Sequence, residues 1–214
     1  MPKPTSREGI STIISRLRDS HPNARYELDW ETPEQLLVAT ILAAQCTDER
    51  VNKVTKTLFV KYPSPQAFAE ADIAELEEDL KPTGFYRQKA KTVKEVNRAL
   101  CEYHDGRIPK SIEEMITLPG VARKSANVVL NTAFNMPTGI IVDTHVSRVA
   151  PRLGLTKKEK PEEIEADLMK LVPKDEWTFF GPAMVLHGRY TCVAKKPKCG
   201  ECNLEDICEK RGVE

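Results

Sequence analysis

Apolar residues recur every three or four positions along most of the chain, the spacing that buries one face of an α-helix. A first helix is predicted from Ser6, its N-cap, to about residue 20. Its apolar face consists of Ile10, Ile13, Ile14 and Leu17. We also predict helices over residues 36–44, 161–171 and 177–190, and one or two short helices over residues 66–80. No stretch alternates in a way that indicates a strand, so we predict an all-α protein.

Capping patterns predict where several other helices begin. Residues 32–35 combine a cap, a first-turn proline and a capping-box partner. Asp48 is expected to cap the helix that follows it, and Ser111 opens a capping box. Residues 111–134 then form a pair of helical arms joined by a turn, and a further helix follows Asp143.

The turn between the two arms is the sequence Leu118-Pro119-Gly120-Val121-Ala122. Pro119 fixes its own φ, and Gly120 can take a positive φ that side chains resist. Such a turn points successive backbone N–H groups outward at the start of the next helix, where the helix dipole adds partial positive charge. The pattern therefore predicts a phosphate-binding site that does not read bases.

Two cations and one carboxylate stand near this turn in the sequence. Arg123 and Lys124 occupy the first turn of the second arm, where cations are unfavourable unless an anion lies in front of them. Asp143 follows the apolar run at residues 139–142. The spacing leaves two interpretations open: Lys124 and Asp143 are a reactive amine and its carboxylate, or a phosphate contact and a plain helix N-cap.

The charge balance is neutral, but its distribution is uneven. The chain has 214 residues with 32 basic and 32 acidic side chains. A neutral total gives no indication of a polyanionic partner. However, residues 70–79 hold six acids and no base, whereas residues 189–198 hold four bases and no acid. No apolar run has the length of a membrane span and the start lacks the core of a secretion signal, so we expect a cytoplasmic protein.

The cysteines indicate a metal centre near the end of the chain. Four of them are separated by gaps of six, two and five residues: Cys192, Cys199, Cys202 and Cys208. Only one pair has the close spacing of a zinc knuckle. Four thiolates at irregular gaps favour an iron-sulfur cluster. Cys46 and Cys101 lie among apolar residues and are interpreted as packed thiols.

The hairpin turn with Arg123-Lys124 and Ala126-Asn127, followed by Val142-Asp143-Thr144-His145, resembles the helix-hairpin-helix signature of the endonuclease III family of DNA glycosylases. The resemblance implies that Lys124 is the nucleophile and that Asp143 assists it. This chain has Ala122 where many members carry a second hairpin glycine. The DNA contacts that we expect around this motif come from Leu118, Gly120, Ala122, Arg123 and Arg148.

The resemblance also gives roles to two loop residues. Gln45 ends the apolar helix at residues 36–44, which on its own is consistent with an ordinary helix end. Phe85 follows Gly84 beside basic residues, where an aromatic side chain is more often a loop anchor. By resemblance, Gln45 is a plug that enters the duplex where a base has been flipped out, and Phe85 is an apolar wedge.

The resemblance extends from about Ser6 to Cys208 and implies two helical lobes with a DNA-binding cleft between them. One lobe is continuous over residues 26–136, and the other combines residues 1–25 and 137–214. The four cysteines would hold a 4Fe-4S cluster within residues 192–208. The loop between the first two cysteines is interpreted either as a phosphate contact or as a solvated cluster of lysines, namely Lys195, Lys196 and Lys198.

The function implied is that of a bifunctional DNA glycosylase/AP lyase that removes oxidised pyrimidines and cleaves 3′ to the abasic site by β-elimination. Neighbouring positive charge and partial burial are expected to keep Lys124 uncharged. The partner would be double-stranded DNA with a damaged base or an abasic site, bound by a monomer associated with the nucleoid. A DNA-binding protein without catalysis and an electron-transfer protein are the alternatives.

Overall fold

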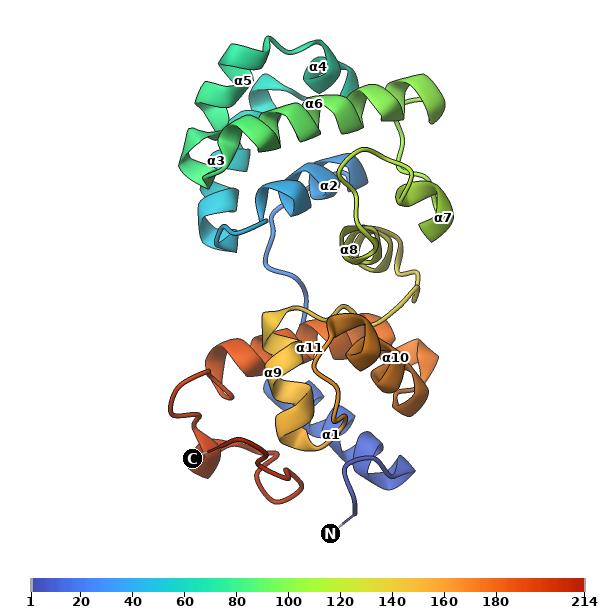
Figure 1. Cartoon of the computed structure of the whole chain (residues 1–214), viewed down its shortest axis with the longest axis vertical. Helices are drawn as coiled ribbons and strands as arrows, with labels where there is room; N and C mark the ends of the chain where they lie inside the picture. Colours follow the sequence, from blue (N-terminus) through green and yellow to red (C-terminus); the bar gives the residue numbers. More distant parts are fainter. Residues whose placement is uncertain (1, 214) are drawn as a thin grey trace. The chain divides into compact units, whose positions relative to one another are not determined.

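The computed structural model describes residues 2–213, and all of their regular structure is helical, which confirms the predicted fold class (Figure 1). Contacts divide the chain into two compact units. We call Glu27–Asn135 the middle unit, and Met1–Tyr26 together with Met136–Glu214 the split unit.

The middle unit contains seven α-helices and one 3-10 turn within the described residues. They are α2 (Pro33–Leu42), α3 (Asp48–Lys61), α4 (Pro65–Glu70), α5 (Ile73–Leu80), η1 (Lys81–Thr83), α6 (Tyr86–Tyr103), α7 (Ile112–Met115) and α8 (Arg123–Phe134). The split unit contains α1 (Arg7–Ser20), α9 (Thr144–Leu153), α10 (Pro161–Leu171), η2 (Lys174–Glu176), α11 (Trp177–Tyr190) and η3 (Cys199–Glu201).

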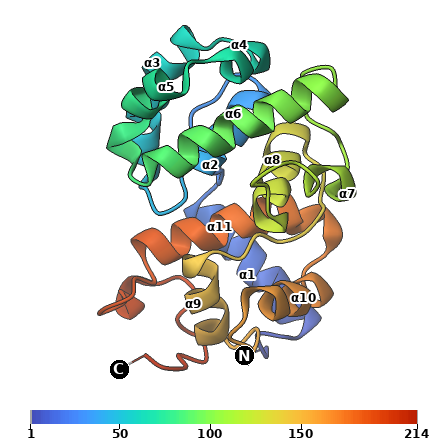
Figure 2. The ribbon, with the colours of Figure 1, turned by 45° about the horizontal axis from the view of Figure 1, so that its top comes forward.

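Helix α2 is central to the middle unit because apolar residues cover almost all of its sides. Its buried residues are Leu36, Leu37, Val38, Ala39, Ile41 and Leu42. This helix contacts α3, α6 and α8, and the long helix α6 packs against α4 and α5 (Figures 1 and 2). Burial on every side makes α2 a fixed support for the loops at its two ends.

The core of the split unit joins helices from both ends of the chain. Ile13 and Leu17 of α1 lie in one apolar cluster with Phe180 of α11 and Val149 of α9. Arg16 of α1 also donates a hydrogen bond to the Asn203 carbonyl oxygen at 2.8 Å. The N-terminal helix therefore supports the segment that carries the cysteines.

Helix starts follow the predicted caps in three of the four cases described above. The hydroxyl groups of Ser6, Thr32 and Ser111 each accept a hydrogen bond from a first-turn N–H. The prediction for Asp48 is wrong, because the Thr47 hydroxyl accepts from Arg50 N and makes Thr47 the N-cap. Asp48 is the first residue of α3, where its negative charge interacts favourably with the helix dipole.

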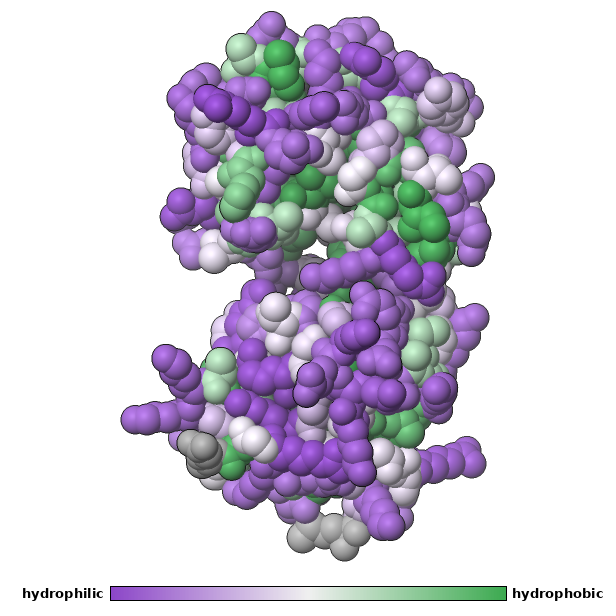
Figure 3. Space-filling view, viewed as in Figure 1, coloured by the Kyte–Doolittle hydropathy of each residue, from purple (hydrophilic) through white to green (hydrophobic). Residues whose placement is uncertain are grey.

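Within the described residues, no helix is long and apolar enough to cross a bilayer. Polar side chains cover most of the face that Figure 3 displays for each unit. Phe85 is one of the few large apolar residues that are exposed, with 66% of its surface accessible.

Candidate functional site

The turn between α7 and α8 has the geometry that its sequence predicts. Val121 N donates to the Leu118 carbonyl oxygen at 3.1 Å, and Gly120 has a φ of +72°. Proline followed by a residue with positive φ is the pattern of a type II turn. A Cβ at position 120 would lie 2.3 Å from Cγ2 of Thr92, so this turn requires glycine both for its backbone and for its contact with α6.

The start of α8 is open to an anion. Ala122 is its N-cap residue, with an extended backbone at φ −84° and ψ 162° and no side-chain cap. An extended backbone accepts alanine, so a second glycine is not needed here. The first N–H groups of α8 have no side-chain partner at the cap, and Arg123 and Lys124 are exposed beside them.

The exposure of Lys124 corrects one expectation. We expected partial burial to help keep its amine uncharged, but the side chain is exposed in the first turn of α8. The reason is geometric: the buried face of α8 starts two residues later, at Ala126. An exposed primary amine beside the predicted phosphate-binding turn is accessible to a large substrate.

Asp143 is the N-cap of α9. Its Oδ1 atom accepts hydrogen bonds from His145 N at 2.8 Å and from Val146 N at 2.9 Å. Both of these hydrogen bonds are made by the same carboxylate oxygen, so the residue is a helix cap that holds its side chain through Oδ1. Burial raises the pKa of the nearby Tyr26 phenol well above its ordinary value, and the negative charge of Asp143 acts in the same direction.

Gln45 and Phe85 share an unusual backbone conformation. Their φ values are +52° and +48°, and both residues are exposed. Residues other than glycine, asparagine and aspartate rarely adopt this left-handed region, and such strain clusters at functional sites. Lys196 of the cysteine loop, also exposed, has a φ of +52°.

The four C-terminal cysteines line a single cavity in the split unit. Among the described residues, no three Cys, His, Asp or Glu side chains form a group that could hold one metal ion. The cysteines are therefore arranged around a space rather than at a point. This donor set suits a cluster in which each thiolate binds a different iron atom.

Hydrogen bonds to sulfur surround this cavity. Leu204 N and Lys210 N donate to the Sγ atoms of Cys202 and Cys208 at 3.4 and 3.3 Å. Burial raises the pKa of both thiols, and the neighbouring cysteines act in the same direction. His187 of α11 places Nε2 3.7 Å from Cys202 Sγ, and burial lowers the pKa of His187 to about 4. No sequence motif points to His187, because it lies outside the loop.

Two arginines of α9 hold the first part of the cysteine loop. Arg148 donates to the carbonyl oxygens of Cys192 at 3.2 Å and Gly188 at 2.7 Å. Arg152 donates to the carbonyl oxygens of Val193 at 2.8 Å and Ala194 at 3.0 Å. The arginines support the loop that exposes Lys195, Lys196 and Lys198. A DNA contact by Arg148 stays a prediction.

The predicted site residues are divided between the two units. The middle unit holds Gln45, Phe85 and the hairpin residues Leu118, Gly120, Ala122, Arg123 and Lys124. The split unit holds Asp143, Arg148, the basic loop and the cysteines. Leu118 is buried and supports the turn, whereas Arg123 and Lys124 project from it.

Comparison with known protein families identifies the class of protein to which this chain belongs. Residues 38–174 match the family described as HhH-GPD superfamily base excision DNA repair protein. Residues 192–208, which begin and end at the outer two cysteines of the cavity, match the iron-sulfur binding domain of endonuclease III. The fold and the cysteine site thus define a helix-hairpin-helix base excision repair protein with an iron-sulfur domain.

The similarity to individual proteins is high along the whole length. Endonuclease III of Synechocystis sp. is 51% identical over 95% of this chain and 93% of its own. A solved non-covalent endonuclease III–DNA complex matches with a TM-score of 0.90 at 41% identity, over 96% of both chains. A trapped endonuclease III–DNA covalent intermediate matches with a TM-score of 0.90 at 40% identity, over 96% of both chains.

The chain belongs to the endonuclease III family. It is a DNA N-glycosylase and AP lyase of base excision repair with an iron-sulfur domain.

Replacing Cys202 by serine is expected to remove the visible absorbance of the iron-sulfur cluster and to lower the melting temperature. Serine is a poor ligand for iron in such a centre, and Cys202 also packs against the core of the split unit. Absorbance spectra and thermal unfolding check this result. Cys101→Ser, which changes a cysteine of the middle unit, is the control and should keep the colour. Full absorbance in the Cys202 variant would contradict the assignment of this ligand.

Proposed function

We propose that this enzyme removes oxidised pyrimidines from double-stranded DNA and then cleaves the strand on the 3′ side of the abasic site by β-elimination. The observation that carries the proposal is the exposed Lys124 amine in the first turn of α8, directly after a phosphate-binding turn. A covalent intermediate has been trapped in a solved endonuclease III–DNA complex that resembles this chain.

The hairpin would position the DNA backbone. The turn around Gly120 points the first N–H groups of α8 toward an anion, and the guanidinium of Arg123 adds charge. These contacts bind phosphate without reading the base, so the enzyme can inspect any sequence. They also place a deoxyribose close to the start of α8, where the Lys124 amine lies.

The proposed reaction starts when the unprotonated Lys124 Nζ attacks C1′ of the deoxyribose. The N-glycosidic bond breaks, and the base leaves with the bonding electrons and takes up a proton. The attached amine loses a proton, the C1′–O4′ bond breaks as the C1′=N bond forms, and O4′ takes up a proton, which gives an open-chain protonated Schiff base. Removal of a C2′ proton then expels the 3′ phosphate and leaves an unsaturated sugar. Water finally hydrolyses the Schiff base and restores the Lys124 amine.

Asp143 is proposed to assist at two points. Its ionised carboxylate would stabilise the positive charge that develops on the sugar, and it would accept the proton that Lys124 loses. Oδ2 is the atom available for this role, since Oδ1 is held by the N–H groups of His145 and Val146. The cap fixes the orientation of the carboxylate, so the same residue serves both stability and catalysis.

Gln45 and Phe85 are proposed to extrude the damaged nucleotide. A base inside a duplex is out of reach of the amine, so it must rotate out of the stack. The exposed Phe85 ring would wedge between bases, and the Gln45 amide would fill the space that the base leaves. A lesion that stacks poorly costs less to extrude, which contributes to selectivity.

The cysteine loop is proposed to carry a 4Fe-4S cluster and a second phosphate contact. The ligands would be Cys192, Cys199, Cys202 and Cys208 around their common cavity. When bound, the cluster supplies iron–thiolate bonds that cross-link the loop. The exposed side chains of Lys195, Lys196 and Lys198 would then bind phosphates and make affinity fall with salt, by roughly one unit of log-log slope per phosphate neutralised.

The lesion preference is tested with purified protein and matched duplexes that contain thymine glycol, 8-oxoguanine, uracil or an abasic site. We expect strand cleavage at thymine glycol and at the abasic site, and little cleavage at 8-oxoguanine or uracil. Equal cleavage of all four duplexes, or preference for uracil, would contradict the assignment to oxidised pyrimidines. Sedimentation with and without DNA tests the further proposal that the enzyme acts as a monomer.

A further inference from the structure

Lys89 of α6 is a buried lysine that contacts the ends of the two elements leading into the Gln45 and Phe85 turns of the middle unit. Only 5% of its surface is exposed. Its Nζ donates to the Leu42 carbonyl oxygen at 2.8 Å and to the Thr83 carbonyl oxygen at 2.8 Å. Leu42 is the last residue of α2 and precedes the Gln45 turn, whereas Thr83 precedes the Phe85 turn.

A buried ammonium group is unfavourable unless it is well hydrogen-bonded, and burial lowers the pKa of Lys89. An apolar side chain of similar length would pack at this place without that penalty. The two carbonyl contacts are therefore the property that distinguishes lysine from a hydrocarbon side chain here. Both contacts are to the backbone, so Lys89 fixes where each turn begins.

The Leu42 carbonyl is available because α2 stops there. Cys46 N, which would reach Leu42 O in a continued helix, instead donates to Ala43 O at 3.1 Å. A cation at the C-terminus of a helix satisfies such an unpaired carbonyl and interacts favourably with the dipole. Lys89 thus binds the C-terminus of α2, three residues before Gln45 adopts its left-handed backbone conformation.

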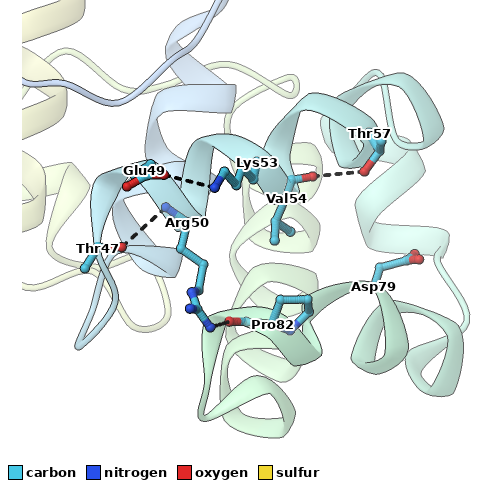
Figure 4. A pocket seen from close by; sticks show the side chains of 8 residues that line it. All are labelled: Thr47, Glu49, Arg50, Lys53, Val54, Thr57, Asp79 and Pro82. Carbon is cyan, nitrogen blue, oxygen red and sulfur yellow. Dashed lines mark hydrogen bonds and ion pairs between the residues drawn. The ribbon is translucent and has the colours of Figure 1, made fainter.

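A second, exposed contact connects the start of α3, which follows the Gln45 turn, to η1, which precedes the Phe85 turn. Figure 4 shows the side chain of Arg50, from the start of α3, extending toward Pro82 of η1 along one side of a pocket. Arg50 Nη1 donates to the Pro82 carbonyl oxygen at 3.4 Å. This hydrogen bond is longer than the two that Lys89 donates, and it is open to water. The hydrogen bonds of Lys89 are therefore the stronger ones.

We propose that Lys89 is a positioning residue that fixes the spacing between the Gln45 and Phe85 turns, so that the plug and the wedge enter the duplex together. The inference rests on the proposed roles of these two side chains. Without the Lys89 ammonium group the turns move independently, and the nucleotide is extruded less efficiently. The Lys124 amine, which belongs to α8, keeps its reactivity toward a sugar that is already accessible.

The experiment compares Lys89→Met with the unchanged enzyme under single-turnover conditions. The first substrate is a thymine glycol duplex with 2-aminopurine beside the lesion, whose fluorescence reports unstacking. The second is an abasic site in single-stranded DNA, which requires no extrusion. We expect the unstacking signal and duplex excision to fall on the order of 10²-fold, the effect of a small misplacement, and single-strand cleavage to change little. Lys89→Arg, which can donate to both carbonyls, should restore part of the signal.

Lys94→Met is the matched control. Lys94 lies on the same helix and donates to the Ala71 carbonyl oxygen, away from both turns. This variant should lose a comparable contact and keep normal unstacking. An equal loss on both substrates in Lys89→Met, or the same defect in Lys94→Met, would overturn the proposal.

A double-mutant cycle separates this inference from the function on which it rests. In a Gln45→Ala/Phe85→Ala background, adding Lys89→Met should have little further effect, because the side chains that it positions are absent. If that background extrudes the base normally, the plug and wedge roles fail, and the inference fails with them. If the background is defective but Lys89→Met alone is not, only the role of Lys89 fails.

Discussion

Lys124→Gln is expected to lose strand cleavage at an abasic site, by roughly 10³-fold or more, while it still folds and binds DNA. Glutamine keeps the length and polarity of the side chain but cannot form a Schiff base, so the covalent route is closed. Because Lys124 is exposed, the change removes no core packing. Gel analysis of a labelled abasic duplex measures cleavage, and circular dichroism checks the fold.

The control is Lys91→Gln, which removes an exposed lysine from α6 in the same unit. It should cleave abasic DNA at the normal rate. If Lys124→Gln cleaved abasic DNA at a near-normal rate, another amine would have to form the Schiff base. The hairpin would then serve only to bind phosphate.

Asp143→Asn is expected to bind DNA normally and to turn over about 10²- to 10⁴-fold more slowly, the usual contribution of a group that transfers a proton in the transition state. Asparagine is also a good N-cap, so its side-chain oxygen can keep the hydrogen bonds from His145 N and Val146 N. The melting temperature should therefore stay close to that of the unchanged enzyme. Single-turnover excision of thymine glycol measures the rate.

Asp143→Ala separates the two roles of this residue. It should lose the same activity and, in addition, about 1 kcal/mol of stability, because alanine cannot cap α9. If Asp143→Asn were fully active and Asp143→Ala were only less stable, Asp143 would be a helix cap and nothing more.

The sequence predicts the helices well because the middle and split units are built from amphipathic segments with clear start signals. Ser6, Thr32 and Ser111 cap their helices as expected. Thr47 and Asp48 are adjacent and both suit a cap, so only the backbone conformation decides between them. The positive φ of Gly120 is the conformation that the sequence predicts, since proline followed by glycine restricts the turn to few conformations.

The parts of the site that the sequence does not reveal depend on contacts between distant segments. Lys89 looks like one more basic residue of α6, and only the packing shows that it is buried against Leu42 and Thr83. Arg152 likewise reaches the cysteine cavity from α9, which lies far away in the sequence, and His187 reaches it from α11, before the first cysteine. The expected burial of Lys124 was wrong, since exposure at the first turn of α8 depends on where the buried face begins.

The most direct measurement of the central claim is reduction of a mixture of enzyme and abasic duplex with borohydride, followed by protease digestion and mass spectrometry. Borohydride converts a Schiff base into a stable amine, so the cross-linked peptide identifies the attacking group. We predict that the adduct forms on Lys124 and is absent from Lys124→Gln. An adduct on another lysine or on the N-terminal amine, or no adduct from an enzyme that cleaves the same DNA, would contradict the account.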